Sequence, residues 1–224
     1  MGRRAAFFDV DGTLTTRPTL FAFLAEHLVA RGWSTVDAGA AVDRLRGLSR
    51  AGRPRQEVLR AYARHLAGAE ERAALATGAR WHLAEVAAGG LYRPEAVAAL
   101  RAHRAAGALV VLVSGSFPPC LDPIAAELGA DVLLCSRPQV RDGRYTGELP
   151  TPVIGERKAE AVHRLAAVHD LDLDRSAAYG DHISDVPLLA AVGHPVVVGD
   201  DPVLTAHARQ HGWSASAPEL TGRQ

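Results

Sequence analysis

The sequence predicts an α/β fold, a parallel sheet with helices on both faces and an all-helical domain inserted after its first strand. Short apolar runs alternate with segments whose apolar residues recur at helical spacing, which is typical of a parallel sheet. Between the apolar runs at residues 5–10 and 109–113, residues 19–88 show helical spacing and no β-rich run. A block of this length exceeds a simple crossover, so we expect it to form a separate helical domain.

Each predicted strand is a short apolar run that ends in turn residues. The run at residues 5–10 leads into an Asp-Gly-Thr turn, and the run at 109–113 leads into Ser114-Gly115-Ser116. Asp142-Gly143 predicts a β-hairpin, because Asp-Gly favours a two-residue turn. Its strands are expected at residues 139–141 and 144–147, and the other strands at 132–135, 176–179 and, as the last strand, 196–198.

The predicted helices carry apolar side chains at helical spacing and are separated by glycine or proline. We expect three or four helices within residues 19–88, and further helices at residues 94–106, 123–128, 157–169 and 186–192. The predicted domains are a Rossmann-like α/β core, residues 1–15 and 89–224, and an all-helical cap, residues 16–88.

Composition and charge exclude several classes of partner. Lys plus Arg and Asp plus Glu both number 25, so the chain lacks the basic excess of nucleic-acid-binding proteins. No apolar run reaches the roughly 18 residues that span a bilayer, and the N-terminus lacks the apolar region of a signal peptide. Cys120 and Cys135 form no CxxC pair and fall in predicted core elements. We therefore expect a cytoplasmic protein with buried free thiols and neither nucleic acid nor membrane as a partner.

Polar side chains stand just beyond the predicted strands. Asp9 and Asp11 follow the first strand, Ser114 the second, and Asp181 and Asp185 a later one. Ligands of open α/β sheets bind at the carboxyl edge of the strands, so these side chains are candidate site residues. Gly12 would let the backbone approach a ligand closely.

Four clusters together resemble the ordered motifs of the haloacid dehalogenase (HAD) superfamily: Asp9-Val10-Asp11-Gly12-Thr13-Leu14, Ser114-Gly115-Ser116, Lys158, and Gly180-Asp181 with Asp185. The match runs from the first strand to the last. The helical block between the first two motifs is similar to that of the phosphoserine phosphatase-like subclass (subfamily IB). The resemblance implies a Mg²⁺-dependent phosphatase that hydrolyses a small phosphorylated metabolite.

The resemblance also implies a role for each motif residue. Asp9 would attack phosphorus and form an aspartyl-phosphate, and Asp11 would act as general acid and then general base. Oxygen ligands suit Mg²⁺, and they would come from Asp9, the Asp11 backbone carbonyl, Asp181 and Asp185. The phosphoryl oxygens would be held by Ser114, the N–H of Gly115 and Lys158. The acid at position 11 favours phosphoryl transfer over dehalogenation.

Some positions depart from the phosphoserine phosphatase pattern. No acid occurs in residues 15–19, where those enzymes carry a Glu that pairs with the substrate ammonium group. Ser116 replaces a Gly of the second motif, and Ser184 replaces the usual Asn of the fourth. These changes disfavour a strict phosphoserine phosphatase. Arg17, if it points inward, would favour an anionic or hydroxyl-bearing leaving group.

Other interpretations stay open. The scaffold could serve a phosphotransferase or mutase, or a binding protein without activity, although every expected catalytic side chain is present. Ser114 and Asp185 could cap the segments that follow them, and His182 could face solvent. Phe117 is expected to pack under the cap, and core packing is the expected role of Trp81, His82 and Tyr92. The sequence leaves open a monomer or a homodimer, and Mg²⁺ or Mn²⁺.

Overall fold

The computed structural model describes residues 2–215, and within them the chain divides into two compact units. The first comprises residues 2–16, 92–113 and 155–215, and the second comprises 17–91 and 114–154. The predicted cap, 16–88, falls almost wholly in the second unit. That unit also contains residues 114–154, which the prediction assigns to the core. The division into a catalytic core and a cap stays a prediction.

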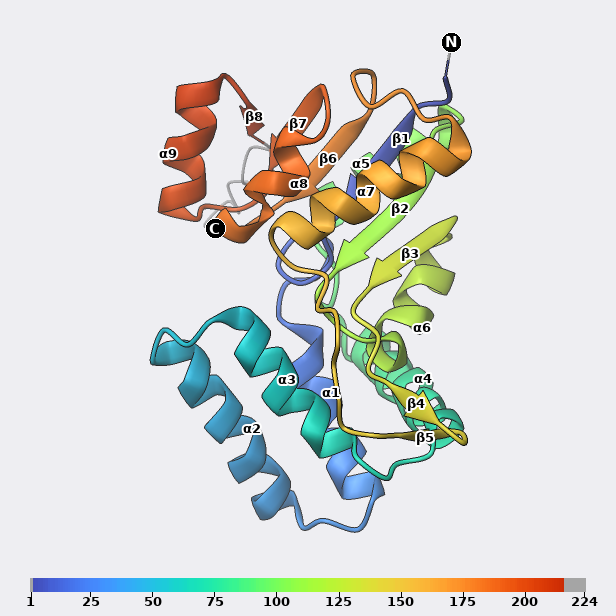
Figure 1. Cartoon of the computed structure of the whole chain (residues 1–224), viewed down its shortest axis with the longest axis vertical. Coiled ribbons are helices and arrows are strands. Elements are labelled where there is room, and N and C mark those ends of the chain that lie inside the picture. The colour runs from blue at the N-terminus through green and yellow to red at the C-terminus, as the bar shows by residue number, and fades with distance from the viewer. Residues whose placement is uncertain (1, 216–224) are drawn as a thin grey trace. The chain divides into compact units, whose positions relative to one another are not determined.

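The first unit is built on parallel strands in the order β2-β1-β6-β7-β8. Both β1 and β2 are buried along their whole length, as expected for central strands with helices on both faces. Figure 1 shows α7 crossing the near face of these strands, with α5 behind β1. The predicted parallel α/β fold is confirmed. The strands are β1 (Ala5–Phe8), β2 (Leu109–Ser114), β6 (Ala177–Gly180), β7 (His194–Val197) and β8 (Ser214–Ala215).

The helices of this unit follow the predicted pattern up to residue 190. They are α5 (Pro94–Ala105), α7 (Glu156–His169), the 3₁₀ turn η1 (Ile183–Asp185), α8 (Val186–Ala190) and α9 (Pro202–His211). The strand predicted as the last one is followed by α9 and β8, so the prediction ended the fold too early. The signal for α9 was present in the sequence. The Asp201 carboxylate accepts a hydrogen bond from the Leu204 N–H at 2.7 Å, and Pro202 occupies the first helical turn.

The second unit contains five helices and a small β-hairpin (Figure 1), and four of these helices lie within residues 19–88, where three or four were predicted. Its core includes Tyr62, whose hydroxyl donates to the Leu20 carbonyl at 2.9 Å and whose ring meets Phe117 edge-on at 5.1 Å. Its elements are α1 (Thr19–Ala30), α2 (Thr35–Arg50), α3 (Arg55–Leu66), α4 (Glu71–Ala88), α6 (Pro118–Leu128), β3 (Val132–Cys135), β4 (Val140–Arg141) and β5 (Arg144–Tyr145).

Two details of the second unit test the sequence prediction. The Asp-Gly hairpin is confirmed, because Asp142 and Gly143 have φ of 51° and 73°, as a type I′ turn requires. The helix predicted from residue 123 was placed too late, since α6 begins at Pro118. Pro118 and Pro119 occupy the first helical turn, where a missing N–H costs no hydrogen bond.

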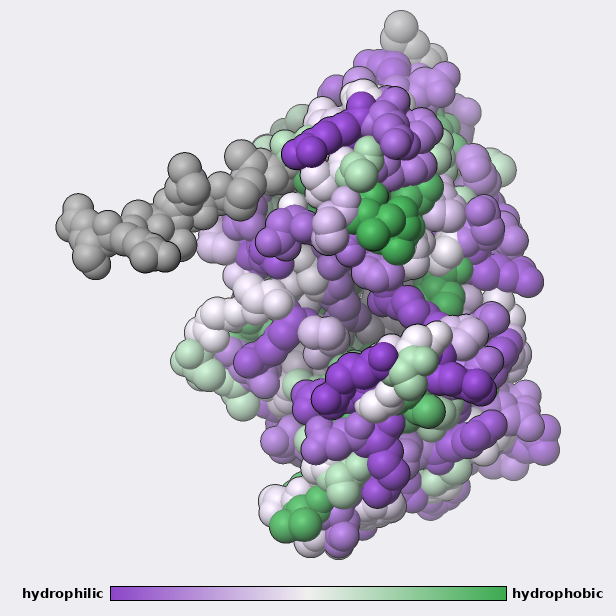
Figure 2. Space-filling model, turned by 90° about the vertical axis from the view of Figure 1, so that its left-hand side faces the viewer, coloured by the Kyte–Doolittle hydropathy of each residue, from purple (hydrophilic) through white to green (hydrophobic). Residues whose placement is uncertain are grey.

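The surface carries isolated apolar side chains. Val36, Leu83, Val168 and Val203 are the most exposed large ones in the part of the chain that the structure describes. The face drawn in Figure 2 is mostly hydrophilic, with small separate apolar patches. Within residues 2–215, no helix combines the length and the apolar character needed to cross a bilayer. Both cysteines are buried free thiols, as predicted.

Candidate active site

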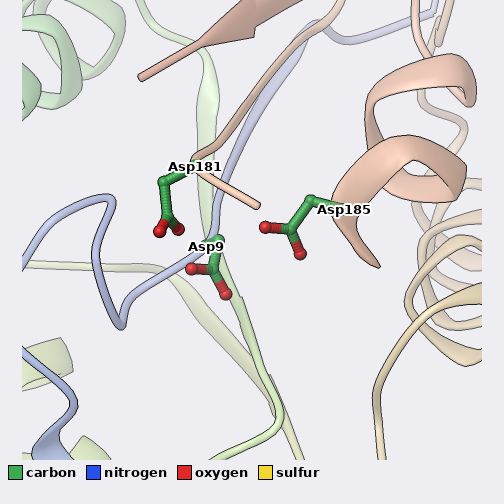
Figure 3. Close-up of side chains that lie close together, drawn as sticks. All are labelled: Asp9, Asp181 and Asp185. Carbon is green, nitrogen blue, oxygen red and sulfur yellow. The ribbon is translucent and has the colours of Figure 1, made fainter. Parts of the chain in front are cut away.

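Three carboxylates gather at the carboxyl edge of the sheet in the first unit. Asp9 follows β1, Asp181 follows β6, and Asp185 ends η1. Because Phe8 pairs with Tyr179 across the parallel β1–β6 ladder, the residues after these strands emerge side by side. One oxygen from each carboxylate lies within 4.8 Å of the others, and Figure 3 shows the three side chains close together. Asp9 and Asp185 are buried and Asp181 is half-buried.

The turn after β1 fits closely around Asp181. Gly12 has φ of +94°, and a Cβ on it would lie 2.1 Å from Asp181 Oδ2, so this position requires glycine. The buried Thr13 hydroxyl donates to Asp181 Oδ1 at 2.9 Å. Within the chain, Gly12 therefore lies against the Asp181 carboxylate, and the close approach of its backbone to a ligand stays a prediction. Sequence reasoning assigned no role to Thr13.

The 3₁₀ turn that carries Asp185 is held by the backbone and side chain of His182. The His182 N–H donates to Asp185 Oδ2 at 3.3 Å, and its Nδ1 accepts from the Ser184 N–H at 3.1 Å. Asp185 occupies the N-cap position of α8, as the capping alternative has it, but its carboxylate makes no capping bond to that helix. Gly180 gives Asp185 room, because a Cβ on it would lie 2.7 Å from the Asp185 Cβ.

Lys158, in the first turn of α7, brings a positive charge to the carboxylates. Its ammonium group donates to Asp9 Oδ1 and, at 2.7 Å, to Asp185 Oδ1. The side chain is buried, with 4% of its surface exposed, so these ion pairs are shielded from water. The structure thus brings together Asp9, Asp181, Asp185 and Lys158 from three of the four motifs.

The electrostatics of the site indicate a shortage of positive charge. Burial raises the pKa of Asp9 well above its usual value, and the Asp185 and Asp181 carboxylates raise it further, against the opposing effect of Lys158. Burial and Asp185 also raise the pKa of Asp181. Burial alone would lower the pKa of Lys158, but the Asp185 and Asp9 carboxylates outweigh it and raise that pKa.

The donor set fits a hard divalent cation. Three carboxylates and one ammonium group leave two formal negative charges in a largely buried space when all are ionised. Oxygen-only ligands are those that Mg²⁺ and similar ions prefer. The residues present therefore suit Mg²⁺ in both charge and chemistry.

Asp11 lies in the turn after β1, and Arg93 forms a hydrogen bond to that turn. Asp11 is half-buried and lies outside the set of three gathered carboxylates. Arg93 Nε donates to the Gly12 carbonyl at 2.8 Å, which links the start of α5 to the Gly12 turn. Sequence reasoning missed Arg93, since its only local signal is the following Pro94, which marks a helix start.

The second-motif residues belong to the second unit. Ser114 is buried and its Oγ accepts from the Ser116 N–H at 3.0 Å, so it does order the segment that follows. A Cβ at Gly115 would lie 2.7 Å from Ile154 Cγ2, which explains the glycine there. The predicted phosphate-binding roles of Ser114 and Gly115 stay predictions.

In the second unit, called the helical unit below, the candidate substrate-contacting residues make their contacts with other residues of the same unit. Arg17 is half-exposed and forms an ion pair with Glu85 of α4. His82 is buried, with Nε2 2.9 Å from Glu127 Oε2, and Trp81 packs on Phe23. These contacts support the structural interpretation of Trp81 and His82.

Comparisons with known proteins agree on one family. A family model described as haloacid dehalogenase-like hydrolase matches residues 6–190. A probable phosphatase of Mycobacterium tuberculosis is 34% identical over 94% of this chain and 74% of its own length. The crystal structure of a Bordetella pertussis protein of unknown function is 30% identical, with a TM-score of 0.85 over 97% of this chain and 99% of its own. A phosphoserine phosphatase structure, 19% identical with a TM-score of 0.65 over 91% and 90% of the two chains, shares the fold.

Proposed function

The chain belongs to the haloacid dehalogenase-like hydrolase family, and on this premise we propose that it is a Mg²⁺-dependent phosphatase that cleaves a small phosphomonoester through an aspartyl-phosphate on Asp9. The predicted superfamily and the predicted hydrolase class are confirmed by the family match. One observation carries the finer proposal: a buried Asp9 contacts Lys158 and lies beside Asp181 and Asp185.

The proposed metal ligands are Asp9, Asp181, Asp185 and the backbone carbonyl of Asp11. When bound, Mg²⁺ would neutralise the carboxylates and the phosphate, so that an anionic nucleophile can approach an anionic ester. The closely packed oxygens of the three side chains support this assignment. Thr13 holds Asp181 in place through its hydroxyl, at a distance of 2.9 Å.

In the first proposed step, an Asp9 carboxylate oxygen bonds to phosphorus while the bond to the ester oxygen breaks. The Asp11 carboxyl group gives its proton to the leaving alkoxide. In the second step, water attacks phosphorus, Asp11 accepts the water proton, and phosphate leaves with regeneration of the Asp9 carboxylate. Lys158, which already contacts Asp9, orients this carboxylate and offers positive charge to the phosphoryl oxygens. Ser114 and the Gly115 N–H are the other proposed phosphate contacts.

We propose a small phosphorylated metabolite as substrate. Residues 15–19 lack an acid for a substrate ammonium group, which weighs against strict phosphoserine specificity. Arg17 is paired with Glu85, so the proposal does not include a contact between Arg17 and the leaving group. The balanced charge and the scattered exposed apolar side chains argue against nucleic acid and membrane as partners. The two buried thiols suit a reducing cytoplasm.

Phosphate release from a panel of phosphorylated metabolites, with Mg²⁺, tests this proposal. We expect release by the wild type and by Asp43→Asn, a control at an exposed acid of α2, and none by Asp9→Asn. Equal release by the wild type and Asp9→Asn would refute the nucleophile assignment. If no compound releases phosphate, the phosphotransferase alternative takes precedence and acceptor alcohols are screened next.

A further inference from the structure

The helical unit contains a hollow of about 600 Å³ that none of the proposed catalytic residues lines. It lies against α1, the link between α3 and α4, one face of α4, and Arg144 of β5. We call it the arginine hollow, because Arg31, Arg80 and Arg144 all line it. Its volume falls within the range of small-molecule sites.

The charge of the arginine hollow is strongly positive. Glu70 is the one carboxylate among its described lining residues, and it pairs with Arg144 at 2.5 Å. Arg31 donates instead to the His65 and Ala67 carbonyls, at 3.0 and 3.1 Å. Arg80 donates to the Thr77 hydroxyl at 3.0 Å. Within residues 2–215, neither Arg31 nor Arg80 pairs with a carboxylate, so two positive charges remain uncompensated.

Neutral partners leave most guanidinium donors available. A guanidinium group has five N–H donors, of which the contacts above use two on Arg31 and one on Arg80. The planar donor fork matches the paired oxygens of a phosphate or carboxylate. The hollow is thus equipped for an oxyanion.

The rim of the hollow is held in place by backbone hydrogen bonds. The β4–β5 hairpin pairs with the link before α4 through Gly68 N to Tyr145 O, at 2.8 Å, and Tyr145 N to Ala69 O, at 3.0 Å. The Glu71 N–H donates to the Gly143 carbonyl at 2.9 Å. Arg144 therefore projects from an anchored hairpin, which lowers the entropy lost when a ligand binds.

A buried histidine lies at the wall of the hollow and can report on its occupancy. His27 lines the hollow with 3% of its surface exposed, and its Nε2 has no hydrogen-bond partner within the described chain. Unpartnered buried polar atoms are rare because they lose their hydrogen bonds to water. Burial and the nearby Arg31 lower the pKa of His27 to about 4, so its ring is neutral near pH 7 and one ring nitrogen can donate.

We propose that the arginine hollow binds a small phosphate-bearing molecule, at a site separate from the residues that would carry the hydrolysis. Phosphate is favoured over a single carboxylate, because a dianion matches the two uncompensated charges. The inference rests on the helical unit alone and does not depend on the proposed function.

The test follows the imidazole signals of His27 by ¹H–¹⁵N NMR during titration with inorganic phosphate, without metal, with His27→Gln used for assignment. This readout reports the arginine hollow even if phosphate also binds elsewhere. The variants are Arg80→Gln and the control Arg72→Gln, an exposed arginine of the same helix that does not line the hollow. Titrations with succinate and with chloride, at matched ionic strength, separate phosphate from other anions.

We expect a saturable shift of the His27 signals in the wild type and in Arg72→Gln. In Arg80→Gln the dissociation constant should rise at least about fivefold, as for loss of one charge-assisted hydrogen bond. If Arg80→Gln does not fold, Arg80→Lys, which keeps the charge without the planar fork, should show the same direction. An absent shift, equal affinity of the Arg80 and Arg72 variants, or a response to succinate but not to phosphate would overturn the proposal.

Discussion

Replacing Gly12 by alanine tests whether the turn after β1 positions Asp181. The added Cβ would lie 2.1 Å from Asp181 Oδ2, which is 1.3 Å short of an ordinary contact of 3.4 Å. The carboxylate or the turn must therefore move by about 1 Å. A displacement of about 1 Å at a reacting centre can lower a rate about 100-fold. We expect Gly12→Ala to lower kcat by about two orders of magnitude.

Gly107→Ala is the matched control. Gly107 has φ of +76°, so alanine is strained there as at Gly12, but its added Cβ would meet nothing within 4 Å. Backbone strain should cost both variants roughly 1–2 kcal/mol of unfolding free energy in urea denaturation, and Gly12→Ala should lose more because its Cβ also meets Asp181. Only Gly12→Ala should lose activity in steady-state phosphate release. Activities within twofold of one another would refute the proposed positioning of Asp181.

Three further perturbations follow from the same contacts. Lys158→Met removes the cation between two buried carboxylates and should lower the unfolding free energy, measured in urea without metal, by about 3–5 kcal/mol. Adding Mg²⁺ should recover at least part of this loss. An unchanged unfolding free energy would contradict the buried ion pairs. Thr13→Val removes the 2.9 Å hydrogen bond to Asp181 and should lower kcat about tenfold, the rate equivalent of about 1.4 kcal/mol. A kcat equal to that of the wild type would count against the positioning of Asp181 by Thr13. The pKa of His27 is about 4 in the folded chain, against 6.5 for an unperturbed histidine. Its contribution to the unfolding free energy, up to about 3 kcal/mol, is therefore present above pH 6.5 and lost as the pH falls towards 4. In phosphate-free buffer, His27→Gln should flatten this part of the stability profile, and an unchanged profile would show that His27 does not cause it.

The motif positions predicted that Asp9 and Asp181 would lie at one edge of the sheet, because each directly follows a strand, whereas Lys158 lies in the first turn of α7. The roles of these residues stay predictions. Asp9 and Asp181 are far apart in sequence, yet β1 and β6 are neighbours, so both emerge at one edge. The apolar run alone could not reveal that β1 ends at Phe8, since Val10 continues its hydrophobic pattern. Asp9 stands at the end of the ladder, with its N–H still bonded to the Tyr179 carbonyl at 3.0 Å, and its side chain can meet those of the other strand ends.

The residues that the prediction missed act through contacts that are long-range in sequence. Thr13 meets Asp181, and Arg93 meets the Gly12 carbonyl, at separations that no local pattern encodes. Helix α9 is a different case, since Asp201 and Pro202 form a standard helix start that the prediction overlooked. The start of α6 was misplaced because Pro123 was taken as its first residue, although proline is tolerated at the true start as well.

The charge balance of the site links the fold to the proposed chemistry. Lys158 contacts Asp9 and Asp185, so its ammonium group can offset one carboxylate but leaves the remaining two uncompensated. Burial raises the pKa of Asp9, and a protonated carboxyl group is a poor nucleophile. A divalent cation would restore neutrality and favour the ionised form of Asp9. In the proposed mechanism Lys158 and the metal would thus have complementary roles: the lysine would orient the nucleophile, and the cation would favour its ionised form.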